Sequence, residues 1–328
     1  MAPNPDEKPD LLSPRKLITQ SLGFVIGMAL LIWCIVIAVK GGEGEDISGW
    51  AKIREASPLL VAGLAGCSLI SLFVNGVIFW LVILPVKNLG MWRMEWLNLV
   101  TGVLNYAPIR AGLLARIAYN LRVDRLSLLQ LGGWFLALAF TMVLTLGACI
   151  LATIVWPDFD LIWVAILLGQ LILGGLLAWA VMGHPLIIRH GKGMDQMLRR
   201  PVCLWGAIGL RLIDISAYVG RMACAAAILD LSLPFADIML LGFAALALSL
   251  NPLGRIGFRE AAVAFVASRL VAPELGGAHL EASMAQLALV ESAGEAMLFI
   301  PIGAIALLWY RKRWRDAAAA NGQIDDAD

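Results

Sequence analysis

The sequence predicts an all-α polytopic membrane protein with six transmembrane helices and two re-entrant helical hairpins, arranged as an inverted repeat. Hydrophobic residues make up 60% of the 328 residues and charged residues only 15%. Soluble domains contain roughly 45–50% apolar residues and about 25% charged residues. The apolar residues gather in runs long enough to cross a bilayer. Lys and Arg collect in alternate loops, as they do in polytopic membrane proteins.

Six apolar runs are long enough to span, since about 20 apolar residues cross the hydrocarbon core. They are Leu17–Val39, Leu59–Leu84, Leu126–Val155, Leu161–Met182, Val202–Leu229 and Met284–Trp309. A signal peptide is the competing interpretation of the first run. Its apolar core is long, no small-residue cleavage site follows it, and the segment before it is acidic as well as basic. These features favour an uncleaved first helix.

Two further stretches, residues 92–121 and 235–271, are apolar at first, break at Pro or Gly beside charged residues, and resume as a short helix. Six spans place both termini in the cytoplasm. All of the basic loops also lie there, provided that each of these two stretches enters the membrane and leaves it on the same side. We therefore expect re-entrant hairpins, the first from the cytoplasm and the second from outside. The expected organisation is a cytoplasmic tail (1–16), a single domain in the inner (plasma) membrane (17–310), and a basic, then polar, cytoplasmic tail (311–328).

The two predicted hairpins carry similar residues. In each, an Arg-x-Gly motif follows a proline, at Arg110–Gly112 in the first and at Arg255–Gly257 in the second. Paired broken segments in opposite orientations indicate a midplane substrate site in transporters. The helix after each break points free N–H groups inward, which favours anions, and neighbouring arginines are suited to phosphate. Interfacial anchoring by snorkelling is the alternative role for these arginines. The candidate substrate-binding residues are Asn105, Pro108, Arg110, Gly112, Arg116, Asn251, Pro252, Gly254, Arg255, Gly257, Arg259 and Glu260.

Further charges lie inside the predicted spans. Arg211 and Asp214 are three residues apart on one helix face, and Glu291 and Glu295 are four apart on the last span. One interpretation is neutralisation, in which Arg211 pairs with Asp214, and Arg259 pairs with one of the two glutamates. The other is coupling of transport to a proton or to the headgroup, because two neighbouring carboxylates repel and one of them then holds a proton more readily.

These motifs resemble the transmembrane region of lysylphosphatidylglycerol synthases and related flippase-like membrane proteins. The family pattern Pro-x-Pro-Gly-Gly-x-Gly-x-x-Glu is similar to residues 251–260, with Leu253 in place of a proline and Arg255 in place of a glycine. A second pattern, Pro-x-x-x-Gly-x-x-x-Arg, is matched by Pro108, Gly112 and Arg116. The last span carries two glutamates where the family often has an arginine. The similarity covers residues 17–310 and is specific in these two motifs.

The resemblance implies movement of a phospholipid or polyprenyl-linked lipid between leaflets, without covalent chemistry. The soluble aminoacyl-transferring domain of the synthases has no counterpart after Arg313, so we expect no synthase activity. A membrane-embedded enzyme acting on lipid headgroups, and a scaffold subunit for a glycosyltransferase or synthase, remain the alternatives. The expected partners are membrane lipids with an anionic headgroup, a membrane-bound synthase or glycosyltransferase, and further copies of this chain, but no nucleic acid. Neither the five cysteines nor the three histidines show metal-ligand spacing, so no metal or cofactor is expected.

Overall fold

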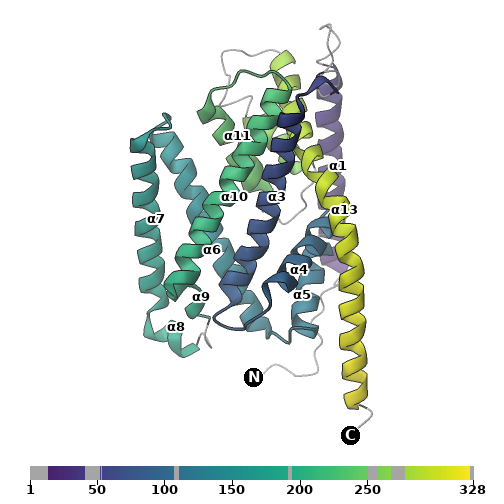
Figure 1. Ribbon diagram of the computed structural model, residues 1–328, viewed down its shortest axis with the longest axis vertical. Helices are drawn as coiled ribbons and strands as arrows, with labels where there is room; N and C mark the ends of the chain where they lie inside the picture. Colours follow the sequence, from purple (N-terminus) through teal and green to yellow (C-terminus); the bar gives the residue numbers. More distant parts are fainter. Residues whose placement is uncertain are drawn as a thin grey trace.

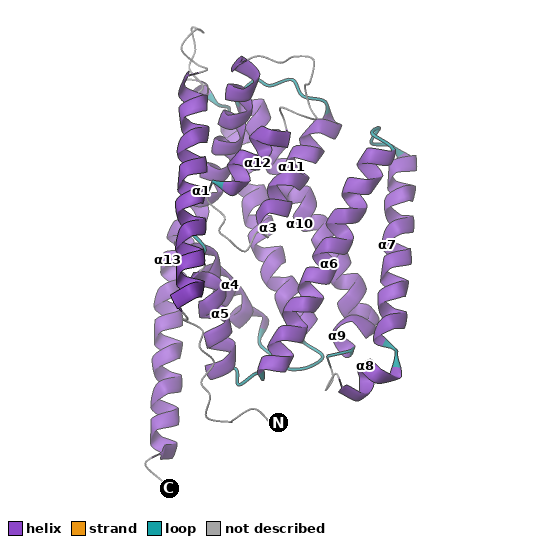
Figure 2. Ribbon diagram, turned by 180° about the vertical axis from the view of Figure 1, so that it is seen from behind, coloured by secondary structure: helices purple, strands orange, loops and turns teal. Residues whose placement is uncertain are grey.

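The computed structural model describes residues 14–40, 52, 54–106, 111–190, 194–249, 257–266 and 278–325, and every regular element among them is a helix. This result confirms the all-α prediction (Figures 1 and 2). The helices are α1 (Pro14–Lys40), α3 (Pro58–Ile83), α4 (Met91–Leu104), α5 (Ala111–Arg122), α6 (Leu128–Val155), α7 (Leu161–Met182), α8 (Pro185–His190), α9 (Gln196–Arg199), α10 (Pro201–Ile228), α11 (Phe235–Ser249), α12 (Phe258–Val266) and α13 (Ala278–Asp325).

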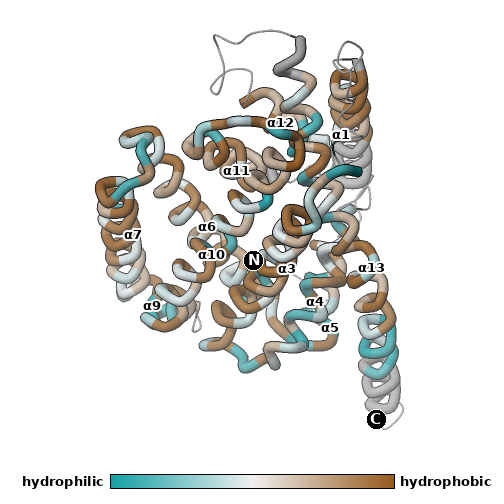
Figure 3. Tube along the Cα trace, turned by 45° about the horizontal axis from the view of Figure 1, so that its top comes forward, coloured by the Kyte–Doolittle hydropathy of each residue, from teal (hydrophilic) through white to brown (hydrophobic). Residues whose placement is uncertain are grey.

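Five helices are long and apolar enough to cross a membrane, namely α3, α6, α7, α10 and the part of α13 from Ala282 to Asp316. They match five of the six predicted spans. The remaining one lies in α1, a helix of 27 residues whose described apolar part is Val25–Val39. The last predicted span ended at Trp309, but α13 stays helical to Asp325. In Figure 3 the long helices are mostly hydrophobic, whereas α4, α5 and the segment of α13 that follows its apolar part carry hydrophilic residues.

Helices α3 and α10 form the centre of the bundle and run antiparallel (Figure 1). A Cβ atom added to Gly63 would lie 3.0 Å from the Cys224 sulfur, and one added to Gly220 would lie 2.9 Å from the Cys67 sulfur. The earlier position on α3 therefore faces the later position on α10, as expected for an antiparallel pair. Small residues at these positions allow the two backbones to approach closely, as in many membrane helix pairs.

The first predicted hairpin consists of α4 and α5, which pack against each other. Gly112 is essential to this packing, because a Cβ there would collide with the Thr101 carbonyl oxygen. At the open end, Arg93 donates a hydrogen bond to the Asp124 carboxylate at 3.0 Å, and Lys87 Nζ donates to the Asp124 backbone carbonyl at 2.5 Å. Burial raises the pKa of Asp124, and the Arg93 hydrogen bond opposes that shift. The start of α4 and the chain after α5 are thus tied together.

The second predicted hairpin contains α11 and α12, which also pack together. Gly257 precedes α12 with a φ of 81°, and a Cβ there would collide with the Gly27 carbonyl oxygen of α1. Its N–H group donates to Glu260 Oε2 at 2.8 Å, which is one half of a capping box. The Ser292 hydroxyl donates to Glu260 Oε1 at 2.5 Å. Gly257 and Glu260 therefore fix the start of α12 against α1 and α13.

Several helix contacts in one half of the chain have a counterpart in the other half. Helix α3 packs on α4, α6 and α13, while α10 packs on α11, α13 and α6. Helix α5 packs on α4 and α6, while α12 packs on α11 and α13; α4 also contacts α13, and α11 contacts α6. Exchanging α3 with α10, α4 with α11, α5 with α12 and α6 with α13 converts each of these contacts into another one. The pair α4–α5 lies toward one end of the bundle and α11–α12 toward the other (Figures 1 and 2).

Candidate functional site

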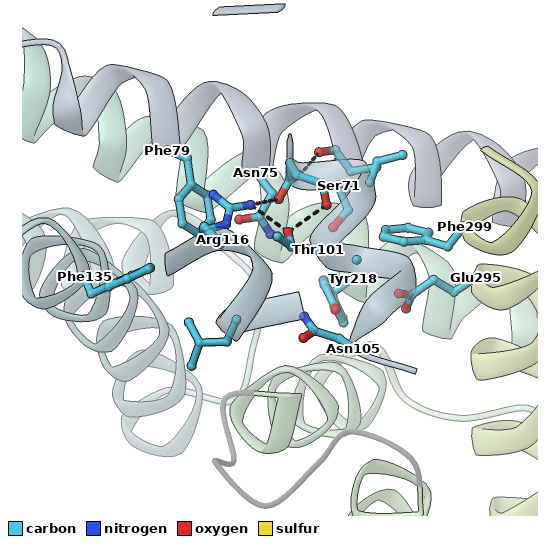
Figure 4. Close-up of a pocket in the computed structure, with 14 residues that line it drawn as sticks. Ser71, Asn75, Phe79, Thr101, Asn105, Arg116, Phe135, Tyr218, Glu295 and Phe299 are labelled. Carbon is cyan, nitrogen blue, oxygen red and sulfur yellow. Dashed lines mark hydrogen bonds between the residues drawn. The ribbon is translucent and has the colours of Figure 1, made fainter. Parts of the chain in front are cut away.

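A polar cavity of about 220 Å³ lies inside the helical bundle, where the first hairpin meets α3, α6, α10 and α13 (Figure 4). Apolar side chains such as Phe79, Phe135 and Phe299 form part of its wall. Eight lining residues are polar: Ser71, Asn75, Asn98, Thr101, Asn105 and Arg116 around the first hairpin, with Tyr218 and Glu295 opposite. A concave site with converging polar groups is a common form of ligand site.

Arg116 is the cation of this cavity. Its side chain comes from α5, and the residue is only 3% exposed. Nη2 donates to Asn98 Oδ1 at 3.0 Å and to Thr101 Oγ1 at 2.8 Å, and the guanidinium lies 3.8 Å from the centre of the Phe79 ring. Among the described residues, the other amino nitrogen, Nη1, has no hydrogen-bond partner. A buried guanidinium with a remaining donor, beside a cavity, is suited to an anion.

Two other polar side chains belong to the surroundings of Arg116. Glu95 of α4 is 6% exposed and lies close enough to attract the guanidinium electrostatically, and its carboxylate packs where a Cβ at Gly76 would be. Asn105 ends α4 and lines the cavity, and its Oδ1 has no hydrogen-bond partner within the described part of the chain. Side-chain amide oxygen and nitrogen are assigned from hydrogen bonding, so Asn105 can present either a donor or an acceptor to a ligand.

A polar clamp links α3 to α10 beside the cavity. Arg211 donates to Asp214 Oδ2 at 3.1 Å and to Asn75 Oδ1 at 3.2 Å. The Ser71 hydroxyl donates to Asp214 Oδ1 at 2.6 Å. The predicted pairing of Arg211 with Asp214 is confirmed, and both partners are nearly inaccessible to solvent. Asn75 and Ser71 also line the cavity, so the clamp holds part of its wall in place.

A second charged group, which we call the ion cluster, consists of Arg221 on α10, Arg259 on α12, and Glu291 and Glu295 on α13. Arg221 pairs with Glu291 at 2.9 Å and with Glu295 at 2.8 Å. Arg259 pairs with Glu295 at 2.8 Å and also with Glu291. No side chain of the cluster is more than 3% exposed. The pairing of Arg259 with a glutamate was predicted; it involves both glutamates, together with Arg221.

Tyr218 and Glu295 connect the ion cluster to the polar cavity. The Tyr218 ring centre lies 3.9 Å from Arg221 Cζ and 5.5 Å from Arg259 Cζ, which is within cation–π range. Both Tyr218 and Glu295 line the cavity (Figure 4). The cluster therefore lies directly behind one wall of the cavity.

The structure divides the predicted site residues into groups. Asn105, Gly112 and Arg116 lie together at the first hairpin, and Arg259, Glu291 and Glu295 meet in the ion cluster. Gly257 and Glu260 fix the start of α12, and Arg211 with Asp214 forms the clamp. Six predicted residues lie outside the described part of the chain: Pro108, Arg110, Asn251, Pro252, Gly254 and Arg255.

Sequence reasoning missed several cavity and support residues: Ser71, Asn75, Glu95, Asn98, Thr101 and Tyr218. A usable signal was present for Asn75 and Glu95, since a polar or charged residue inside or beside a spanning helix is rarely directed at lipid. The other side chains are too common in membrane helices to stand out. Their importance comes from the neighbouring helix that each of them faces.

A second cavity, of about 350 Å³, lies among α6, α7, α10 and α11. Its wall is mostly apolar and includes Phe159, Trp163 and Phe243. Among its described lining residues none is charged. It therefore provides no counter-charge for a headgroup, and the polar cavity is the better candidate site.

Comparisons of the chain with protein-family models, with curated proteins and with solved structures found no match.

Proposed function

We propose that this protein moves a lipid with an anionic headgroup between the two leaflets of a membrane. The observation that carries the proposal is Arg116, a buried guanidinium that lines a polar cavity and retains an unpartnered donor nitrogen among the described residues. The phosphate of a lipid headgroup is the ligand that this arrangement suits best, since arginine binds phosphate through parallel N–H groups.

The charge balance of the bundle supports an anionic ligand. Arg211, Arg221 and Arg259 each form direct ion pairs with buried carboxylates. Arg116 forms no such direct pair within the described part of the chain; its hydrogen-bond partners are an amide and a hydroxyl, and Glu95 attracts it electrostatically without a direct ion pair. An arginine at the depth of the bilayer centre costs about 2.5–3.5 kcal/mol on insertion scales. A bound phosphate offsets part of that cost, so the site favours an occupied state.

The dimensions of the cavity suit a headgroup but not a whole lipid. Its volume of about 220 Å³ corresponds to roughly seven water molecules at about 30 Å³ each. A phosphate with a small polar substituent fits that space, whereas two acyl chains do not. The chains remain in the bilayer along the apolar outer faces of the helices, and only the headgroup passes through the protein.

We further propose that both hairpins are re-entrant and that the two halves form an inverted repeat. The Arg93–Asp124 ion pair supports re-entry of the first hairpin, because it joins the two ends of that hairpin. The exchange of helix contacts between α3–α6 and α10–α13 supports the inverted repeat. In transporters, inverted repeats with broken helices surround a midplane site, and one repeat moves against the other.

The proposed orientation has both termini in the cytoplasm, in a multi-pass protein of the inner (plasma) membrane. Reporter fusions after Gly90 and Arg125 should both report the cytoplasm, since the first hairpin returns to its side of entry. Fusions after Ser232 and Ala278 should both report the outside. Accessibility of single cysteines at the same positions provides an independent readout. A cytoplasmic signal at Ala278 would show that residues 235–271 cross the membrane.

Transport itself can be tested in proteoliposomes that contain fluorescent phosphatidylglycerol or phosphatidylcholine in trace amounts. Dithionite quenches only the outer leaflet, so the fraction protected after incubation measures exchange. We expect the protein to accelerate exchange of the anionic lipid well above that of the zwitterionic one. Liposomes without protein provide the baseline. Equal acceleration of both lipids would contradict the proposal that Arg116 binds the anionic headgroup. If neither lipid is accelerated, the proposed function is wrong.

A further inference from the structure

The ion cluster has the composition of an anion site that is already filled. Two guanidiniums, Arg221 from α10 and Arg259 from α12, converge on the same two carboxylates, with nitrogen–oxygen distances of 2.8 Å to Glu295. Glu295 Oε2 accepts a hydrogen bond from each of them. A carboxylate held by two arginines in this manner occupies the position that a phosphate oxygen would take, because both anions match the guanidinium fork.

The anion in this site is supplied by only one helix. Glu291 and Glu295 are one turn apart on α13, whereas the two arginines come from two other helices. The formal charges are two positive and two negative, so the cluster is neutral as it stands. If the Glu295 carboxylate leaves and a phosphate monoanion enters, the site is again neutral. Exchange of one anion for another therefore avoids leaving a bare guanidinium in the membrane, which is the costly alternative.

The polar cavity provides the route for such an exchange. Glu295 belongs both to the cavity wall and to the cluster, and Tyr218 lines the cavity while its ring covers Arg221. A phosphate held by Arg116 thus faces the wall behind which the second pair of arginines lies. Rotation of Glu295 into the cavity that it already lines would expose both guanidiniums to that phosphate.

We infer that Arg221 and Arg259 form a second binding site for the phosphate of the transported lipid, and that Glu291 and Glu295 occupy this site in the conformation described here. The inference rests on the proposed function for the identity of the ligand. It assigns the two hairpins different states: the arginine of the first hairpin is ready for a headgroup, and that of the second is blocked by the protein's own carboxylates.

The test counts binding events with dihexanoylphosphatidylglycerol, a soluble short-chain probe, added to purified full-length protein in detergent below the critical micelle concentration of the probe. Isothermal titration calorimetry gives the stoichiometry. We expect the wild type to bind one equivalent. The double variant Glu291→Gln, Glu295→Gln keeps the side-chain shapes and removes the competing charges, so it should bind two. Adding Arg259→Gln to that double variant should return the count to one, and dihexanoylphosphatidylcholine should bind more weakly throughout.

The outcomes separate the two proposals. If the double variant binds no more probe than the wild type, the second site does not exist. If the wild type binds none and the double variant binds one equivalent, the second site stands and the Arg116 site falls. Thermal unfolding in the same detergent shows whether each variant is folded. If the double variant does not fold, the single variant Glu295→Gln replaces it, with one additional, weaker binding event as the expected result and an unchanged stoichiometry as the contradicting one.

Discussion

Replacement of Arg116 by glutamine is expected to abolish selective exchange of anionic lipid in proteoliposomes while the protein remains folded. Glutamine keeps a hydrogen-bond donor, but it lacks the charge and the fork that bind phosphate. Hydrogen bonds to charged groups contribute about 1.5–3 kcal/mol each. Loss of one such interaction lowers headgroup affinity about 10- to 150-fold, since 1.4 kcal/mol is a factor of ten. The initial rate of dithionite-protected exchange at low lipid concentration measures the effect.

Two control variants make this result specific. Arg122→Gln alters an arginine on the same helix that is exposed and stacks against Trp314 rather than lining the cavity, so exchange should stay near the wild-type rate. The double variant Glu95→Gln, Arg116→Gln removes both of these buried charges. It should recover any thermal stability that the single variant loses but not its transport. If the Arg116→Gln variant exchanges anionic lipid at the wild-type rate, Arg116 is not the headgroup site.

Substitution of Arg221 by methionine is expected to have the largest effect on stability. It removes one of the two cations that neutralise Glu291 and Glu295, although all four side chains are at most 3% exposed. Breaking a buried ion pair on one side costs about 3–5 kcal/mol, because the remaining charge is left without compensation. The measurement is the free energy of unfolding in mixed micelles. Arg315→Met, at an exposed position on α13, should change this free energy by less than about 0.5 kcal/mol.

A double-mutant cycle isolates the interaction within the cluster. Glu291→Leu removes a negative charge where Arg221→Met removes a positive one, so the double variant has a neutral cluster again. Its stability should therefore lie closer to the wild type than the sum of the single effects, with a coupling energy in the range of about 0.5–3 kcal/mol found for contacting residues. Additive effects of the two substitutions would show that Arg221 and Glu291 do not stabilise one another.

Most of the fold could be predicted from the sequence because the bilayer acts on the composition of each segment directly. A helix that crosses hydrocarbon needs about 20 apolar residues, and α3, α6, α7 and α10 are apparent as such runs. The break between α4 and α5 could be predicted from Pro108 and Gly112. The extension of α13 past Trp309 could not, since outside the membrane the hydropathy pattern no longer constrains the chain. Lys, Arg and Ala, which are good helix formers, continue the helix there.

The candidate site was less predictable, because it depends on which helices face each other. The pairing of Arg211 with Asp214 follows from their spacing on one helix, since residues three apart are neighbours. The partner of Arg259 could be narrowed only to Glu291 or Glu295. The participation of Arg221 depends on how α10 and α12 each pack against α13, which no local pattern encodes. The same applies to Glu95 beside Arg116 and to Tyr218 between the cavity and the ion cluster.

Under the proposed function, the short length of the first hairpin has a consequence for how transport depends on membrane voltage. At about 1.5 Å of rise per residue, the 14 residues of α4 measure about 21 Å, roughly two-thirds of a hydrocarbon core about 30 Å thick. The polar cavity lies near the end of this short helix. Water that entered it would thin the insulating layer, so the transmembrane voltage would drop over a smaller distance there. The work of carrying one elementary charge across is still about 2.3 kcal/mol per 100 mV. If the two proposed binding sites are used in turn, much of that work for a lipid with net charge falls on the step from Arg116 to the ion cluster, and the resting voltage then biases the direction of that step.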